Sequence, residues 1–235
     1  MFIRQYRNEW KYICRENDLA ILDSRLAAIL DKDIHSGKDG KYDIHSLYFD
    51  DHKDTCAREN DAGISRRFKY RIRYYGKQSN ILTLERKEKL DGRCYKESCY
   101  ISVDQYGKIF SGDVDEVLWE TDNLLLKRFC IHCMTRGFAP KAIVDYQRVA
   151  YVETVTNIRV TLDENITVSD EVSQFLTGNY LRIPLQEQQR HVLEVKFDSI
   201  FPSHISILMT NQNLIQTAFS KYYLGRQKLQ QMGRR

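Results

Sequence analysis

Charged and apolar residues alternate with a period of two in five separate stretches of the chain. Lysine and arginine occupy every second position from Lys69 to Arg73, and the positions between them are aromatic or aliphatic. The same alternation recurs in segments 9–12, 81–89, 158–163 and 191–197. A period of two places each charged set on one face of a β-strand and each apolar set on the other. These stretches therefore predict strands with one charged face and one apolar face.

Three other stretches have helical periodicity. Leucine and isoleucine recur at helical spacing from Leu19 to Leu30, after Asn17 or Asp18 as the capping residue. A second helix is expected over about 122–136, ended by a glycine and followed by a proline. A third helix is expected to begin with Pro202 as its first residue.

Together these elements predict an α+β fold built on an antiparallel sheet. The strands alternate with only about three helices and lack a regular βαβ rhythm. The apolar stripes of the helices must pack on the apolar side of the sheet, so the charged side faces inward if the sheet closes. Charges cannot occupy a dry interior, and such a closed sheet would enclose a wet lumen. We expect residues 1–235 to form a single domain, because barrels reach this length unbroken.

Composition narrows the class of protein without identifying a ligand. The hydrophobic fraction is 42% and the charged fraction 29%, which is ordinary for a globular chain with a buried core. No stretch approaches the roughly 18 apolar residues of a membrane span, and the N-terminus does not resemble a secretory signal. We therefore expect a soluble, cytoplasmic protein. A net charge of +4 is too small to indicate nucleic-acid binding by itself.

Cysteine and histidine form no recognisable metal or nucleophile motif. The six cysteines are expected to be reduced thiols. Cys130 and Cys133 form a single CxxC in an apolar run without a second ligand pair, which favours two thiols on a buried helix over a zinc site. The six histidines include no HExxH spacing, and no glycine-rich dinucleotide loop occurs. Proteases, zinc hydrolases and dehydrogenases are therefore disfavoured.

The charged faces differ in kind from an ordinary wet surface. A single charged strand indicates only a solvated face, but here nearly every polar position on several strands is Arg, Lys or Glu. Converging cations repel one another unless an anion neutralises them, and phosphate suits both guanidinium and ammonium groups. The candidate cations are Lys11, Lys69, Arg71, Arg73, Lys87, Lys96, Arg148, Arg159, Lys196 and Lys221.

Four carboxylates share these faces, namely Glu9, Glu85, Asp163 and Glu194. Carboxylates in a phosphate site are expected when they hold a divalent ion that bridges them to phosphate oxygens. The residue types therefore indicate a long anion with repeating phosphates, bound together with Mg²⁺ or Mn²⁺.

Seven short motifs follow one another along the chain: Glu-Trp-Lys at 9–11, Arg-Ile-Arg-Tyr-Tyr-Gly at 71–76, Leu-Glu-Arg-Lys at 84–87, Asp-Tyr-Gln-Arg-Val-Ala-Tyr at 145–151, Ile-Arg-Val-Thr-Leu-Asp at 158–163, Leu-Glu-Val-Lys-Phe at 193–197 and Phe-Ser-Lys-Tyr at 219–222. In this order they resemble the VTC domain, the polyphosphate polymerase domain of vacuolar transporter chaperone complexes. The resemblance extends from about residue 4 to residue 226. It implies the fold of triphosphate tunnel metalloenzymes, a closed antiparallel β-barrel of about eight strands that forms a charged tunnel with helices on the outside.

The resemblance implies an enzyme that transfers the γ-phosphoryl group of ATP to a growing polyphosphate chain. Residues expected to act in catalysis are Arg71, Arg73, Lys87 and Lys221. Residues expected to bind phosphate are Lys11, Lys96, Arg148 and Arg159, with Lys196 added from the charged face. Ser220 is either a phosphate donor or a turn hydroxyl. Lys69 matches none of the motifs and is expected at the tunnel mouth.

The resemblance to the VTC domain implies that Glu194 is the principal ligand for Mn²⁺ or Mg²⁺, and Glu85 and Glu9 are further candidates. The wider superfamily often opens with Glu-x-Glu-x-Lys, whereas Arg7 stands at the first of these positions here. This departure favours the polymerase branch, where one metal is expected, over a hydrolytic site with two metals.

The function has three alternatives to polymerase activity, namely a hydrolase, a binding module and, as the least favoured, a nucleic-acid binder. A tripolyphosphatase or nucleoside triphosphatase would use the same cations, and a non-catalytic polyphosphate-binding module would need affinity alone. A nucleic-acid binder is disfavoured because Tyr70 and Tyr74 fall on the apolar face, opposite Arg71 and Arg73. The expected partners are ATP and inorganic polyphosphate or triphosphate, and a separately encoded membrane partner stays open.

Overall fold

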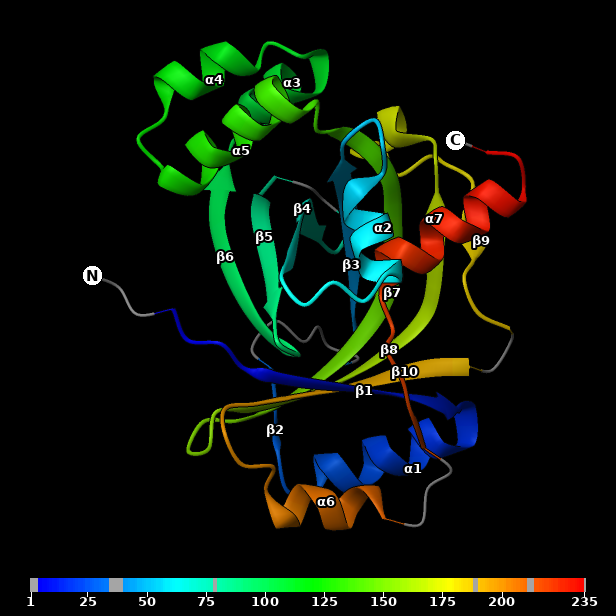
Figure 1. Cartoon of the computed structure of the whole chain (residues 1–235). Coiled ribbons are helices and arrows are strands. Elements are labelled where there is room, and N and C mark those ends of the chain that lie inside the picture. Colours follow the sequence, from blue (N-terminus) through cyan, green and yellow to red (C-terminus); the bar gives the residue numbers. More distant parts are fainter. Residues whose placement is uncertain (1–3, 34–39, 78–79, 188–189, 211–213, 235) are drawn as a thin grey trace.

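The fold is organised around one antiparallel sheet. The computed structural model describes residues 4–33, 40–77, 80–187, 190–210 and 214–234. Eight long strands follow the order β1-β10-β8-β7-β3-β4-β5-β6, with β11 beside β1, β2 beside β7 and β9 beside β8 (Figure 1). The strands are β1 (Asn8–Arg15), β2 (Asp31–Lys32), β3 (Tyr42–Asp50), β4 (Arg67–Tyr75), β5 (Leu82–Leu90), β6 (Arg93–Ile101), β7 (Ala139–Glu153), β8 (Ile158–Ser169), β9 (Ile183–Pro184), β10 (Arg190–Phe197) and β11 (Ile215–Gln216).

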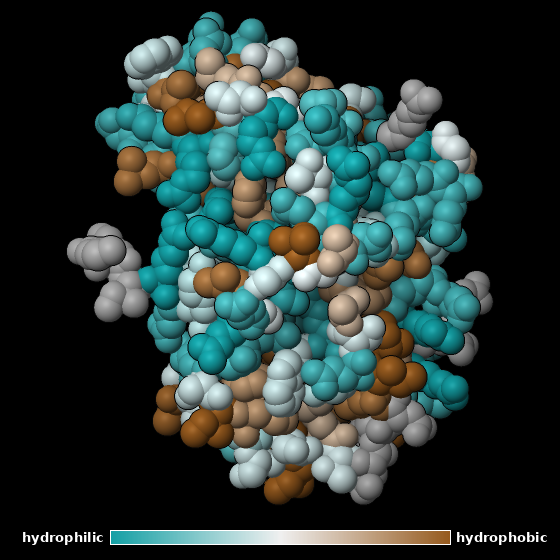
Figure 2. Space-filling view, in the orientation of Figure 1, coloured by the Kyte–Doolittle hydropathy of each residue, from teal (hydrophilic) through white to brown (hydrophobic). Residues whose placement is uncertain are grey.

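Helices cover the outer side of this sheet. In Figure 1, α1 and α6 lie below β1 and β10, α3 to α5 gather at the end of β6, and α2 lies beside α7. Hydrophilic side chains predominate on the face of the molecule seen in Figure 2. The helices are α1 (Glu16–Ala27), α2 (Thr55–Asp61), α3 (Val103–Ser111), α4 (Val114–Glu120), α5 (Leu124–Arg136), α6 (Ser203–Met209) and α7 (Lys221–Gln231), with a 3₁₀ turn at Val172–Gln174.

The apolar side of the sheet is buried beneath the helices in two separate clusters. One cluster joins β3, β4 and β7 to α5, with Phe129 packed edge-on against Phe49 at a ring-centroid distance of 5.0 Å. The other joins Leu22 and Leu26 of α1 to β8 and β10. Burying one such side chain stabilises the fold by about 1.5–3 kcal/mol. With both apolar clusters outside, the charged side of the sheet faces inward, as the alternation predicted.

The α+β class and the antiparallel pairing are confirmed, but the predicted closed barrel is wrong, because the ladder stays open between β1 and β6. Within the described residues, the two edges meet in one isolated bridge. The Arg7 amide donates to the Cys94 carbonyl at 2.9 Å, and the Cys94 amide donates back at 2.8 Å. The twist of the sheet makes β6 and β1 cross at this point instead of running side by side (Figure 1).

The helix ends differ in detail from the predicted ones. Helix α1 begins at Glu16 with Arg15 as its N-cap, and Asp18 accepts a hydrogen bond from the Arg15 amide at 3.1 Å from within the first turn. It ends at Ala27, before the last apolar residues of the predicted helix. Pro202 is the N-cap of α6 and not its first helical residue, because its ψ of 139° is extended.

Helix α5 confirms the second predicted helix closely. The Asn123 side chain caps it by accepting from the amides of Leu125 and Leu126, and Gly137 ends it with a φ of 68°. Cys130 and Cys133 lie on this helix as free thiols, and Cys130 is fully buried, in agreement with the prediction. None of the helices in the described part of the chain is long and apolar enough to cross a membrane.

Candidate functional site

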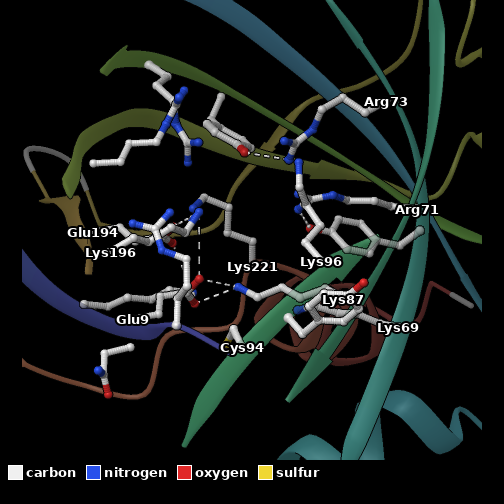
Figure 3. Close-up of a pocket in the computed structure, with 18 of the residues that line it drawn as sticks. Glu9, Lys69, Arg71, Arg73, Lys87, Cys94, Lys96, Glu194, Lys196 and Lys221 are labelled. Carbon is white, nitrogen blue, oxygen red and sulfur yellow. Dashed lines mark hydrogen bonds and ion pairs between the residues drawn. The ribbon is translucent and has the colours of Figure 1, made fainter. Parts of the chain in front are cut away.

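The charged faces of the strands converge on one cavity of about 480 Å³, here called the charged cavity (Figure 3). Antiparallel pairing makes this possible, because it keeps the charged positions of neighbouring strands on the same side of the sheet. The convergence predicted from alternation is thus confirmed. All ten predicted cations line the cavity, namely Lys11, Lys69, Arg71, Arg73, Lys87, Lys96, Arg148, Arg159, Lys196 and Lys221.

Arg71 is held by a buried carboxylate on the neighbouring strand. Its Nε lies 2.6 Å from Oε2 of Glu85, and Lys96 Nζ lies 2.9 Å from the other oxygen of the same carboxylate. Burial raises the pKa of Glu85, but Arg71, Arg73 and Lys96 outweigh burial and bring the pKa well below its usual range. Glu85 therefore stays ionised and keeps both cations at the cavity wall.

Arg73 is fixed by neutral partners. Its Nε donates to Ser46 Oγ at 3.0 Å, and its Nη2 donates to the Tyr146 hydroxyl at 2.9 Å. Within the described part of the chain, its one carboxylate contact is a distant one, 3.8 Å to Glu85. Because two hydrogen bonds fix the guanidinium plane, Arg73 is oriented before any anion binds.

A second buried carboxylate, Asp163 of β8, joins two cations from different elements. Arg148 of β7 donates to both of its oxygens, at 2.6 and 2.8 Å. Lys221, the first residue of α7, donates to Oδ2 at 2.6 Å. This contact fixes the start of α7 against the sheet and places the Lys221 ammonium group at the cavity wall.

Glu9 and Glu194 form a carboxylate pair on the adjacent strands β1 and β10. Lys11 Nζ bridges them, at 3.2 Å from Glu9 and 3.4 Å from Glu194, and Lys196 Nζ lies 2.8 Å from Glu194. The register of β1 and β10 brings these four charges together, because Lys11 pairs with Glu194 while Glu9 pairs with Lys196. Burial and the neighbouring Glu194 raise the pKa of Glu9, but Lys11, Lys87 and Lys196 outweigh both and lower it.

The two carboxylates of this pair suit a divalent ion. Mg²⁺ in proteins is commonly held by one or two carboxylates, with substrate phosphates and water as the other ligands. Glu85, the third predicted metal ligand, lies apart from the pair against Arg71 and Lys96. Among the described residues, no three His, Cys, Asp or Glu side chains form a metal-binding group. The predicted trio of metal ligands is therefore not brought together.

A second cavity, of about 300 Å³, adjoins the charged cavity. The two share five lining residues, which we call the junction: Glu9, Lys11, Lys69, Lys87 and Cys94. Lys69 thus lies at the junction because β4 carries it between the two spaces, and its expected position at a tunnel mouth stays a prediction. Ser220 Oγ caps α7 by accepting from the Tyr223 amide, which agrees with the expected turn hydroxyl, and the residue also lines the second cavity. Its role as a phosphate donor stays a prediction.

Sequence reasoning missed the tyrosines of the cavity wall. The Tyr48 hydroxyl accepts from Arg71 Nη1 at 3.0 Å. Burial raises the pKa of Tyr48, but Arg71, Lys69 and Arg73 outweigh burial and lower it. Tyr48 lies on β3, which has no charged alternation, so the period-two signal was absent there. Tyr70 and Tyr74 lie in the apolar cluster, as predicted.

Comparisons with known proteins agree with this architecture. A family model described as VTC domain matches residues 6–230, and a search of curated proteins returned no significant match. The structure of a proposed adenylate cyclase from Bacillus halodurans is similar with a TM-score of 0.52 and 12% identity, covering 97% of each chain. The PH1819 protein of Pyrococcus horikoshii has a TM-score of 0.48 and 14% identity over 94% of this chain and 99% of that one. At such identities the first similarity concerns the fold alone, and together with the family match it supports a triphosphate-tunnel type of fold.

Proposed function

Because this chain belongs to the VTC domain family, we propose that it is a metal-dependent polyphosphate polymerase. It would transfer the γ-phosphoryl group of ATP to the end of a polyphosphate chain in the charged cavity. The observation that carries this proposal is an excess of positive charge. Among the described residues, eleven cations line the cavity and six carboxylates pair with them, which leaves five positive charges. A polyanion would supply the missing negative charge.

Arg71 and Arg73 are suited to hold the phosphoryl group that is transferred. Both guanidinium groups are already fixed in place, by Glu85 for Arg71 and by Ser46 and Tyr146 for Arg73. A planar guanidinium donates two parallel hydrogen bonds to phosphate oxygens. Prior positioning of such donors lowers the barrier to phosphoryl transfer, because little reorganisation is needed in the transition state.

The reaction requires a donor and an acceptor in line. A terminal oxygen of the polyphosphate chain attacks the γ-phosphorus of ATP, and the bond from that phosphorus to the β,γ-bridging oxygen breaks, which releases ADP. Lys87 and Lys221 are suited to orient the two reactants, since they reach the cavity from β5 and from the start of α7. Holding both reactants in this geometry supplies much of the rate acceleration.

Glu194 and Glu9 would hold Mg²⁺ or Mn²⁺. Such an ion would offset negative charge on the phosphates when bound. The lysines that now neutralise this carboxylate pair, Lys11 and Lys196, would then be free to contact phosphate. The remaining predicted phosphate ligands, Lys96, Arg148 and Arg159, line the same cavity.

Phosphorus NMR of the purified protein with ATP, with and without Mg²⁺ or Mn²⁺, tests the proposal. Growth of an internal-phosphate signal together with ADP is the expected result. Release of orthophosphate alone would identify a hydrolase of the same fold. Unchanged ATP with every metal, together with tight binding of polyphosphate, would identify a binding module. Either of these two outcomes would refute polymerase activity.

A further inference from the structure

Lys69 differs from the other cations that line the charged cavity. Within the described residues, each of the other ten has a carboxylate within 4.0 Å, as Lys87 has Glu9 and Lys96 has Glu85. No described carboxylate lies within that distance of Lys69. Its Nζ donates to Ser220 Oγ at 3.2 Å and lies 5.6 Å from the centre of the Tyr48 ring. Among the described cations of this wall, Lys69 is therefore the one without a described carboxylate within 4.0 Å.

Lys69 also has a distinctive position, because it lies at the junction of the two cavities. It pairs with Lys87 across β4 and β5, and Lys87 pairs in turn with Lys96 of β6, so three lysines stand in one row (Figure 3). Two residues farther along, Arg67 pairs with Lys89, and both line the second cavity. Two residues along a strand correspond to about 6.6 Å. The basic wall thus continues past Lys69 into the second cavity, away from Arg71.

The surroundings of Lys69 disfavour its charge in the absence of an anion. Burial lowers the pKa of Lys69 to about 8; Tyr48 opposes this shift, and Lys87, Lys11 and Arg71 add to it. A negatively charged ligand at Lys69 would remove the penalty and favour the protonated amine. Tyr48 of β3, Arg71 of β4, Lys87 of β5 and Lys11 of β1 act electrostatically on Lys69, and Ser220 accepts its hydrogen bond. The other titratable groups that line the second cavity with Lys69 are Glu9 of β1, Cys56 and Asp61 of α2, Arg67 of β4, Lys89 of β5, Cys94 of β6 and Tyr222 of α7.

We propose that Lys69 binds a phosphate group of a chain that extends from the charged cavity into the second cavity, and so selects long polyphosphate over short phosphate ligands. This inference rests on the proposed function for the identity of the ligand. Lys69 and Arg73 lie four residues apart on β4, about 13 Å along the strand, so a short phosphate ligand centred on Arg73 would stay on the side of Arg71 away from the second cavity. A longer chain has to pass Lys69, and it gains the contact that the shorter ligand lacks.

Calorimetric titration with tripolyphosphate and with long-chain polyphosphate tests this specificity without requiring turnover. Lys69→Met removes the charge and keeps the length of the side chain. Lys127→Met on α5, outside both cavities, is the matched control. Lys69→Met should weaken binding of the long chain by about ten- to a hundredfold, the effect of losing one contact to a charged group. It should leave binding of tripolyphosphate unchanged, and the control should change neither.

Lys69→Arg provides a second, independent readout. Arginine stays protonated far above neutral pH, whereas Lys69 loses its proton above a pKa of about 8. We expect the wild type to bind the long chain more weakly at about pH 9 than at about pH 7, and Lys69→Arg to lose less of its affinity over this range. Thermal melting of each variant confirms that it is folded.

Two results with the Lys69→Met variant would overturn the proposal. One is an equal loss of affinity for both ligands in Lys69→Met, which would mean a general electrostatic effect. The other is no loss for the long chain. Wild-type protein that binds long polyphosphate without extending it would refute the polymerase activity and leave the selection by Lys69 intact. Wild-type protein that binds no polyphosphate would refute both.

Discussion

Asp163 provides the sharpest test of how the charged wall is held together. Its side chain is fully buried and accepts three hydrogen bonds, two from Arg148 and one from Lys221. Asp163→Asn keeps the shape of the side chain but removes its charge, and one carboxylate oxygen becomes an amide group that cannot accept. Two buried cations would then face each other without a carboxylate between them.

The expected loss of stability follows from the burial of this group. Removing one partner of a buried ion pair costs about 3–5 kcal/mol, because the other charge is left uncompensated. The neighbouring residue offers a matched control. Glu164 lies next to Asp163 on β8 and pairs with Lys41 at the surface; the side chain of Glu164 is 12% exposed and that of Lys41 is 45% exposed. A surface pair of this kind contributes about 0–1 kcal/mol, so Glu164→Gln should have little effect.

Urea unfolding at neutral pH measures both variants. We expect Asp163→Asn to lose at least about 3 kcal/mol of the free energy of unfolding relative to Glu164→Gln. Added tripolyphosphate should restore part of the loss, because an anion that binds only the folded state stabilises it and here replaces the missing charge. Equal and small losses in the two variants would refute the reasoning, as would a full loss that tripolyphosphate leaves unchanged.

The pH dependence of stability gives a further check on Asp163. Burial raises the pKa of Asp163, but Arg148 and Lys221 outweigh burial and lower it. An unfolded chain has an Asp pKa of about 3.9. The stability that this carboxylate contributes is therefore fully present above that pH and is lost as the pH falls through the lower pKa of the folded state. We expect the unfolding free energies of wild type and Asp163→Asn to converge as the solution is acidified.

Three further predictions concern the metal site, the phosphoryl clamp and the core. Glu194→Gln should abolish turnover that depends on a divalent metal, as seen by phosphorus NMR, in a protein that still folds but melts at a lower temperature, because Lys11 and Lys196 lose a buried carboxylate partner; Glu187→Gln, at an exposed carboxylate, should keep that turnover, and an active Glu194→Gln variant would contradict the assignment. Arg73→Lys should lower the rate of ATP turnover by about tenfold or more, because an ammonium group cannot reproduce the fixed guanidinium plane; an unchanged rate would exclude Arg73 from the reaction. Phe129→Ala should cost about 3–5 kcal/mol in urea unfolding, since its ring is fully buried in the core; a cost below about 1 kcal/mol would contradict the packing described.

The sequence by itself determined which face of each alternating strand carries charge. Lys69, Arg71 and Arg73 share a face because side chains alternate along any extended backbone, whatever surrounds it. The same local reasoning located α5, because Gly137 ends the helix within its last turn. It failed for β3, where Tyr48 lines the cavity although the strand contains no Lys or Arg that alternates with apolar residues.

Only the tertiary structure decided which carboxylate meets which cation. Glu85 was expected at a metal with Glu9 and Glu194, yet it lies against Arg71 on the paired strand. The open edge between β1 and β6, the position of Lys69 between two cavities and the helix that begins at Lys221 are long-range features of the same kind. They depend on the register and twist of strands far apart in the chain, which side-chain alternation within one strand does not encode.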